Sequence, residues 1–111
     1  MRREKEYREV NRMFSLKTYD TKKGKLVAAC DHSILGKKFK EKGVILHLKE
    51  SFYHEEKVEF ERVKEEVEEA QIANLVGENL VEKFIEESIV SSEEVKEVEE
   101  VPHIQIFVLE K

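Results

Sequence analysis

Three residues with reactive side chains, Cys30, Asp31 and His103, are the candidates for catalysis in this chain. A cysteine becomes a nucleophile when a helix N-terminus or a cationic neighbour lowers the pKa of its thiol. Cys30 directly precedes a predicted helical turn. His103 opens a predicted last strand. If that strand runs antiparallel beside the strand ending at Cys30, His103 approaches Cys30, and Asn74 or Gln105 is placed to orient its imidazole. The interpretation that we favour is a small buried cysteine, an Asp31 that caps the helical turn and a packed histidine. Cys30 should therefore react slowly with thiol reagents.

No cofactor and no metal site is predicted. The four histidines and the single cysteine show neither CxxC nor HExxH spacing, and the pair Cys30 and His32 offers only two ligands. Gly36, Lys37 and Lys38 resemble only the end of a phosphate loop, because the full spacing GxxxxGK[ST] is absent. The weaker alternative is that the Gly36 amide and these two lysines hold a single phosphate.

Two groups of lysines are the better candidates for a binding surface. The first lysine group, in a predicted turn, is Lys22, Lys23 and Lys25. The second lysine group, in the loop that follows, is Lys37, Lys38, Lys40 and Lys42. Phe39 lies within the second group and is a candidate for stacking on a nucleic-acid base. If both groups form one patch, a polyanion meets up to seven lysines while the acidic helices face away. The alternative is a solvated charged surface with Phe39 in the core.

The distribution of charge along the chain supports this choice. Residues 1–42 contain 13 lysines and arginines and 6 acidic residues, whereas residues 43–111 contain 7 and 19, which leaves a net charge of −5. Such asymmetry indicates a surface that faces a polyanion. Lys and Glu dominate a charged fraction of 41%, a composition reported for hyperthermophiles. No run approaches the roughly 20 apolar residues of a membrane span, and a lone cysteine favours the cytoplasm.

The apolar pattern predicts one α+β domain over residues 13–111, preceded by a charged, frayed arm over residues 1–12 that folding does not require. Alternating or apolar runs predict strands at 13–19, 26–30, 44–48, 95–98 and 104–109, with a polar loop over 37–43. Residues 55–90 carry a helical apolar stripe, which we expect to break between Glu68 and Asn79, with Gly77 the strongest candidate. The expected fold is a mostly antiparallel sheet of four to five strands with two helices packed on one face.

Five motifs occur in order along the chain: VAACD at 27–31, LGK at 35–37, FY at 52–53, ANLVGE at 73–78 and VPHIQ at 101–105. In this combination, from Met13 to Leu109, the chain resembles a small archaeal family, the domain of unknown function number 424. The resemblance implies an archaeal, cytoplasmic protein. It supplies no catalytic residues to carry over.

Three functions remain open from the sequence. The leading hypothesis is a non-enzymatic binding module that contacts RNA, a ribonucleoprotein or an acidic protein through its lysines. The second is a small enzyme that uses Cys30, Asp31 and His103. The third is a structural subunit that assembles through a sheet edge or a helix pair. A membrane partner is not expected.

Overall fold

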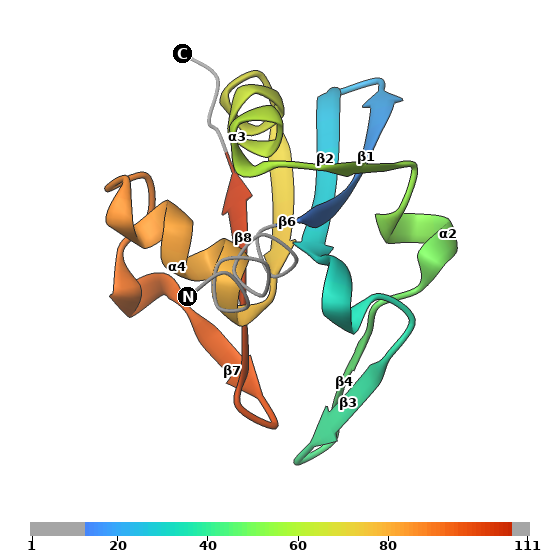
Figure 1. Ribbon diagram of the computed structural model, residues 1–111, viewed down its shortest axis with the longest axis vertical. Coiled ribbons are helices and arrows are strands. Elements are labelled where there is room, and N and C mark those ends of the chain that lie inside the picture. The colour runs from blue at the N-terminus through green and yellow to red at the C-terminus, as the bar shows by residue number, and fades with distance from the viewer. Residues whose placement is uncertain (1–12, 108–111) are drawn as a thin grey trace, which may run out of the picture.

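The computed structural model describes residues 13–107, which form one six-stranded sheet, a separate two-stranded hairpin and the helices that pack on them (Figure 1). The spatial order of the main sheet is β5-β1-β2-β6-β8-β7. Its strands are β1 Phe14–Thr21, β2 Gly24–Asp31, β5 Glu56–Val58, β6 Ile72–Val76, β7 Lys96–Val98 and β8 Val101–Phe107. The two central strands, β2 and β6, run parallel, whereas the other neighbouring pairs of this sheet are antiparallel.

The remaining elements lie on the two faces of this sheet. The separate hairpin consists of β3 Lys38–Glu41 and β4 Val44–His47. The α-helices are α2 Glu50–Tyr53, α3 Phe60–Glu68 and α4 Glu78–Glu86. Single 3-10 turns occur at η1 His32–Ile34 and η2 Ser92–Glu94. Ser91 and Glu94 form a capping box at η2, where both reciprocal hydrogen bonds are present.

Helices α3 and α4 cover one face of the sheet, as the sequence predicts. Alternate strand residues point toward them, because side chains of a strand alternate between its two faces. The buried core on this face combines residues of four strands and both helices: Phe14, Leu16, Val27, Ala29, Ala73, Leu75, Ile104, Phe60, Val63, Val67, Leu80, Val81 and Phe84. The rings of Phe60 and Phe84 meet edge to face with centroids 5.0 Å apart, which joins the two helices.

The opposite face, here called the open face, is only partly covered. A second apolar cluster, built on Ala28, Cys30, Leu48, Tyr53 and Val76, packs the β3–β4 hairpin and α2 against β2 and β6. Over β8 the open face carries a cleft, whose lining includes His103, Gln105 and Phe107 of this strand. This part of the open face contains the candidate site.

The expected break near Gly77 is in fact a strand, β6, so the sheet is mixed and has six strands rather than four to five antiparallel ones. Helix α3 ends at Glu68, and Gly77 precedes α4 with φ 120°. Ala73 and Leu75 face the helices, whereas Asn74 lies on the open face. A short apolar run that is buried on both faces looks the same in a helix and in a parallel strand, and this ambiguity explains the difference.

Three further expectations differ from the structure. The predicted polar loop over residues 37–43 contains β3, and the strand from Val44 pairs with β3 rather than with the main sheet. The start of the predicted helical segment contains β5, which pairs with β1 at the sheet edge. The predicted last strand does not lie beside β2, because β6 separates the two. The arm over residues 1–12 lies outside the described residues.

Candidate functional site

A cleft of about 360 Å³ lies on the open face between two hairpins. Its floor comes from β6 and β8, one wall from Leu46 of β4 and Tyr53 of α2, and the other from Glu94 of η2 and Lys96 of β7. The volume falls within the range of ligand-binding pockets, about 300–1,000 Å³. The cleft is therefore large enough to receive one planar ring system.

The floor of this cleft carries two side-chain amides and an exposed aromatic ring. Asn74 and Gln105 are cross-strand neighbours, and the Gln105 Nε2 donates a hydrogen bond of 2.8 Å to the Asn74 Oδ1. Phe107 lies two residues beyond Gln105 on the same face of β8, and 61% of its surface is exposed. An exposed phenylalanine beside polar amides is suited to bind a flat, polar ligand rather than to fill a core.

Two side chains of the cleft, His103 and Tyr53, have pKa values that their surroundings shift. Burial, and then Lys96, lowers the pKa of His103, so the imidazole is neutral at pH 7. Burial, and then Cys30 and Tyr19, raises the pKa of Tyr53 to about 12, so the phenol keeps its proton. The cleft thus offers mainly neutral hydrogen-bonding groups, with a cation, Lys96, and a carboxylate, Glu94, in the same wall.

The two hairpins meet at their tips, beyond the cleft. Glu99 Oε2 accepts a hydrogen bond of 2.6 Å from the backbone N–H of Lys40, and Glu41 Oε1 accepts one of 2.6 Å from the N–H of Glu99. Each hairpin therefore satisfies a backbone donor of the other. This reciprocal contact holds the two walls of the cleft in a fixed relation.

The three candidates for catalysis are not brought together. Cys30 and His103 both lie opposite Val76, one on each side of β6, so two strand spacings of about 4.8 Å each separate them. Cys30 is buried, as predicted, and burial raises the pKa of its thiol to about 12. Asp31 points to the helix-covered face, where it meets the start of α4. The condition under which His103 would approach Cys30, that their strands are neighbours, is therefore not met.

Asp31 is a helix cap, but not of the turn that follows it. At η1 its side chain makes no capping hydrogen bond. Its carboxylate instead accepts the backbone N–H groups of Asn79 and Leu80 at the start of α4, over 3.0 and 2.8 Å. Burial raises the pKa of Asp31 to about 6, although these two hydrogen bonds oppose the shift.

The two lysine groups lie at opposite ends of the molecule. The β1–β2 turn with the first lysine group is at the top of Figure 1, and the β3–β4 hairpin with most of the second is at the bottom. The two lysine groups therefore do not form one patch, because the eight-residue strand β2 runs between the turn that carries the first group and the segment that carries the second.

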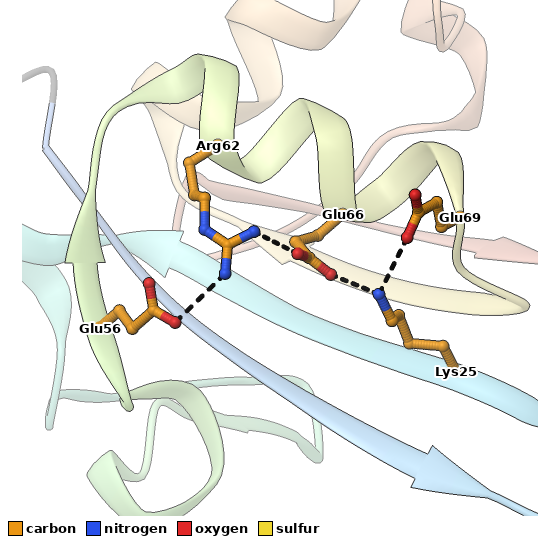
Figure 2. A network of polar contacts seen from close by, with 5 residues as sticks. All are labelled: Lys25, Glu56, Arg62, Glu66 and Glu69. Carbon is orange, nitrogen blue, oxygen red and sulfur yellow. Dashed lines mark hydrogen bonds and ion pairs between the residues drawn. The ribbon is translucent and has the colours of Figure 1, made fainter.

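Lys25 of the first lysine group is engaged by acidic residues of α3. Its Nζ lies 2.6 Å from Glu66 Oε1 and 3.2 Å from Glu69 Oε1 (Figure 2). Arg62 extends this network to Glu66 and Glu56. The acidic helix thus does not face away from this group, which leaves Lys22 and Lys23 as its exposed members.

The second lysine group surrounds a partly buried Phe39. The ring packs with the apolar cluster of the open face, so Phe39 belongs to the core and is not a free stacking surface. Lys38, Lys40 and Lys42 are exposed. Because Lys38 and Lys40 alternate with Phe39 along β3, they lie on the solvent side of this hairpin.

The histidines and Cys30 do not form a metal site, and Gly36 does not form a phosphate site with the lysines that follow it. Residues 13–107 contain no group of three or more His, Cys, Asp or Glu side chains placed to hold a metal ion. The Gly36 N–H donates to the carbonyl of Leu48 over 2.6 Å, so it is not available to a phosphate. Within the same residues, no helix is long and apolar enough to cross a membrane.

A cluster of two histidines and a serine has no signal in the sequence. The buried Ser15 Oγ lies 2.8 Å from His32 Nδ1 and 3.2 Å from His54 Nδ1. Three residues so far apart in the chain share no motif. Only the pairing of β1 with β2 and the return of the chain after α2 bring them together.

Comparisons with known proteins agree with this fold and leave the cleft without an assigned ligand. A solved structure, described as an uncharacterized conserved protein from Methanopyrus kandleri, is similar with a TM-score of 0.74 and 26% sequence identity. The similarity covers 89% of this chain and 94% of that chain. No curated protein matches the chain. A family model described as a protein of unknown function, DUF424, matches residues 19–109. As its five motifs predict, the chain belongs to the DUF424 family.

Proposed function

We propose that this protein is a small, non-enzymatic module that binds single-stranded RNA in the cleft of the open face. The observation that supports this most is the composition of the cleft floor, where an exposed Phe107 adjoins the amides of Asn74 and Gln105. Proteins bind single strands by stacking bases on aromatic rings and by contacting their polar edges. A sheet face with these groups suits such a ligand.

The cations around the cleft support an anionic strand. Lys96 lies in one wall, and the other wall belongs to the hairpin that carries the exposed Lys38 and Lys40. Lys38 and Lys40 lie on the side of this hairpin opposite Leu46. A strand with a base in the cleft would therefore meet Lys96 beside the cleft and these two lysines where it crosses the hairpin. Contacts of this kind supply most of the affinity of a protein for nucleic acid, and they weaken as salt rises.

The chemistry of the cleft favours binding over catalysis. A nucleophile must be activated by a base within hydrogen-bonding distance. Cys30 is separated from His103 by β6, and Asp31 is on the other face. His103 therefore stands in the cleft without the two partners that the enzyme hypothesis requires.

The test is fluorescence anisotropy with a labelled 12-nucleotide single-stranded RNA, measured between about 50 and 200 mM salt, where phosphate contacts change affinity most. We expect Lys38→Ser/Lys40→Ser to weaken binding and to flatten the salt dependence by about 0.7 for each phosphate that is no longer neutralised. Lys22→Ser/Lys23→Ser is the matched control, because it removes two exposed lysines from the far end of the sheet.

The outcomes distinguish RNA binding at the cleft from non-specific attraction to lysines and from the absence of RNA binding. Equal effects of the two double variants would show non-specific attraction and contradict binding at the cleft. No binding at about 50 mM salt, where contacts to phosphate are strong, would reject RNA altogether. An acidic protein would then be the partner to seek.

A further inference from the structure

We propose that the cleft selects adenine, with the amides of Asn74 and Gln105 reading the edge of the base and Phe107 stacking on its face. This inference rests on the proposed RNA binding and adds the base that the site prefers. It follows from the hydrogen-bonding groups that the amide pair leaves free, from their place beside Phe107 and from the edges of the four bases.

The amide pair presents one donor beside one acceptor. Gln105 uses an Nε2 hydrogen to bond the Asn74 Oδ1 over 2.8 Å. The atoms outside this bond are the donor Nδ2 of Asn74 and the acceptor Oε1 of Gln105, while Nε2 keeps a second hydrogen and Oδ1 a second lone pair. If both amides were turned over, the donor and the acceptor would exchange residues, but one of each would remain. The pattern therefore does not depend on the assignment of the amide atoms.

Adenine is the base that matches this pattern at the edge that carries N6 and N7. Its N6 amine donates and its N7 accepts, whereas the corresponding edge of guanine carries two acceptors. Cytosine offers an amine donor there and uracil a carbonyl acceptor. On the Watson–Crick edge all four bases place a donor beside an acceptor, so selection of adenine requires that the base turns its N6/N7 edge to the two amides. A single-stranded base is free to present that edge to a protein.

The position of Phe107 sets the orientation of the base. Strand side chains stand roughly perpendicular to the sheet, so a ring at Phe107 rises from the floor beside Gln105. A base stacked on that ring also stands upright, with one edge turned down to the two amides. Residues two apart along a strand lie about 6.7 Å from each other, which is close enough for both contacts. His103 lies on the other side of Gln105 and bounds the slot.

The experiment compares RNAs that differ only at the base. Anisotropy is measured at about 50 mM salt, where contacts to the strand are strong. The probes are labelled 12-nucleotide oligo(A), oligo(U) and oligo(C), and an oligomer of purine riboside. Purine riboside keeps the ring system, N1 and N7 of adenine but lacks the N6 amine. We expect oligo(A) to bind at least about fivefold more tightly than each of the others, since one good bidentate contact discriminates by that much or more.

Two variants separate edge reading from stacking. Asn74→Ala/Gln105→Ala should abolish the difference between oligo(A) and the purine oligomer while leaving oligo(U) affinity within about twofold, since its phosphate contacts remain. Phe107→Ala should weaken all four RNAs, and Phe107→Tyr should restore them, because every base has a face that stacks. Thermal melts establish that each variant is folded.

The outcomes distinguish this inference from the function on which it rests. Equal affinity of the wild type for all four RNAs would overturn adenine selection and leave RNA binding in place. A preference for oligo(A) that persists in Asn74→Ala/Gln105→Ala would also overturn it. Absence of binding to every probe would overturn both proposals. The purine comparison uses wild-type protein alone, so it decides the question even if a variant fails to fold.

Discussion

At the scale of single residues, Asp31 and Gly77 together fix where α4 begins. Asp31 is 4% exposed, and its carboxylate accepts two backbone N–H groups from the first turn of α4. A Cβ atom at Gly77 would lie 2.4 Å from the Asp31 Cγ, and the backbone there has φ 120°. Position 77 therefore needs glycine for its conformation and for the space that Asp31 fills.

We predict that Gly77→Ala destabilises the protein more than Gly43→Ala does. Both glycines have positive φ, but a Cβ at Gly43 meets no atom within 4 Å. The left-handed conformation alone should cost Gly43→Ala about 1–2 kcal/mol. Gly77→Ala adds the displacement of a buried carboxylate, so its total should be at least about 3 kcal/mol. Urea unfolding of both variants measures the difference. Equal losses would show that Asp31 yields without cost.

The cluster of Ser15, His32 and His54 makes stability depend on pH. A hydroxyl donates only one hydrogen, so of two histidines hydrogen-bonded to Ser15 one receives its proton and the other donates its own. Burial, and then Lys57 and His54, lowers the pKa of His32, while Glu50 opposes the shift. A histidine whose pKa is lower in the folded state takes up its proton first in the unfolded state. Its effect is a loss of stability as pH falls below about 6.5.

We predict that His32→Asn removes part of this pH dependence. Asparagine retains a polar group that can reach Ser15 but does not titrate. Between pH 6.5 and 5 the free energy of unfolding should fall more steeply for the wild type than for His32→Asn. Asp31, with its pKa raised to about 6, acts with the opposite sign between its usual value of 3.8 and pH 6, but equally in both proteins. Parallel curves would contradict the prediction.

At the scale of elements, the sequence pattern predicts an element formed by residues close together in the chain, but not one that depends on a distant strand. The β1–β2 hairpin follows from alternating apolar residues around a turn at Gly24, and its eight register pairs are antiparallel. The strand β6 could not be assigned, because its parallel partner β2 is distant in the chain and its apolar run also fits a helix. The same limit applies to the cleft. The sequence offers Asn74 and Gln105 as alternative groups that orient His103, but their pairing with each other depends on the order of β6 and β8.

In the β7–β8 hairpin, we expect the same substitution by glycine to stabilise the protein in the turn and to destabilise it in the strand before the turn. Glu99 and Glu100 have φ 52° and 68°, the mirror-image turn that fits a tight hairpin and favours glycine or asparagine. We predict that Glu100→Gly stabilises the protein by about 0.5 kcal/mol, because relief of the left-handed conformation exceeds the added freedom of the unfolded chain.

Glu97→Gly is the matched control for this turn, because it removes the same charge from strand β7. Glycine within a strand should cost about 0.5–1 kcal/mol. Thermal melts of the two variants should therefore shift in opposite directions. A shift of both in the same direction would indicate that the removed charge, not the turn, determines the effect.

At the scale of the whole molecule, the basic and acidic parts of the chain do not form separate lobes. Strands β1 and β2 come from the basic part, yet they lie between β5 and β6 from the acidic part. Lys25 therefore meets α3, whose exposed surface is largely glutamate. Charge counted along a sequence reports composition, whereas the sheet order decides which charges become neighbours.

Our last prediction concerns the network that joins these two parts of the chain. Glu66 accepts from Lys25 and from Arg62, and its side chain is only 14% exposed, whereas Glu69 contacts Lys25 alone and is 74% exposed (Figure 2). Exposed pairs contribute little because water and salt screen them. We expect Glu66→Gln to lower the free energy of unfolding by about 1 kcal/mol and Glu69→Gln by less than about 0.5 kcal/mol.

The pH dependence of the Glu66→Gln effect tests its origin. The hydrogen bond from Lys25, followed by that from Arg62, lowers the pKa of Glu66 despite its burial. A carboxylate with a lowered pKa stabilises the fold above its usual value of 4.5 and loses that contribution as pH falls further. Urea unfolding of wild type and Glu66→Gln should thus give a difference near pH 7 that shrinks below pH 4.5. A difference that stays constant at low pH would mean that the substitution disturbs packing rather than the ion pairs that connect β2, α3 and β5.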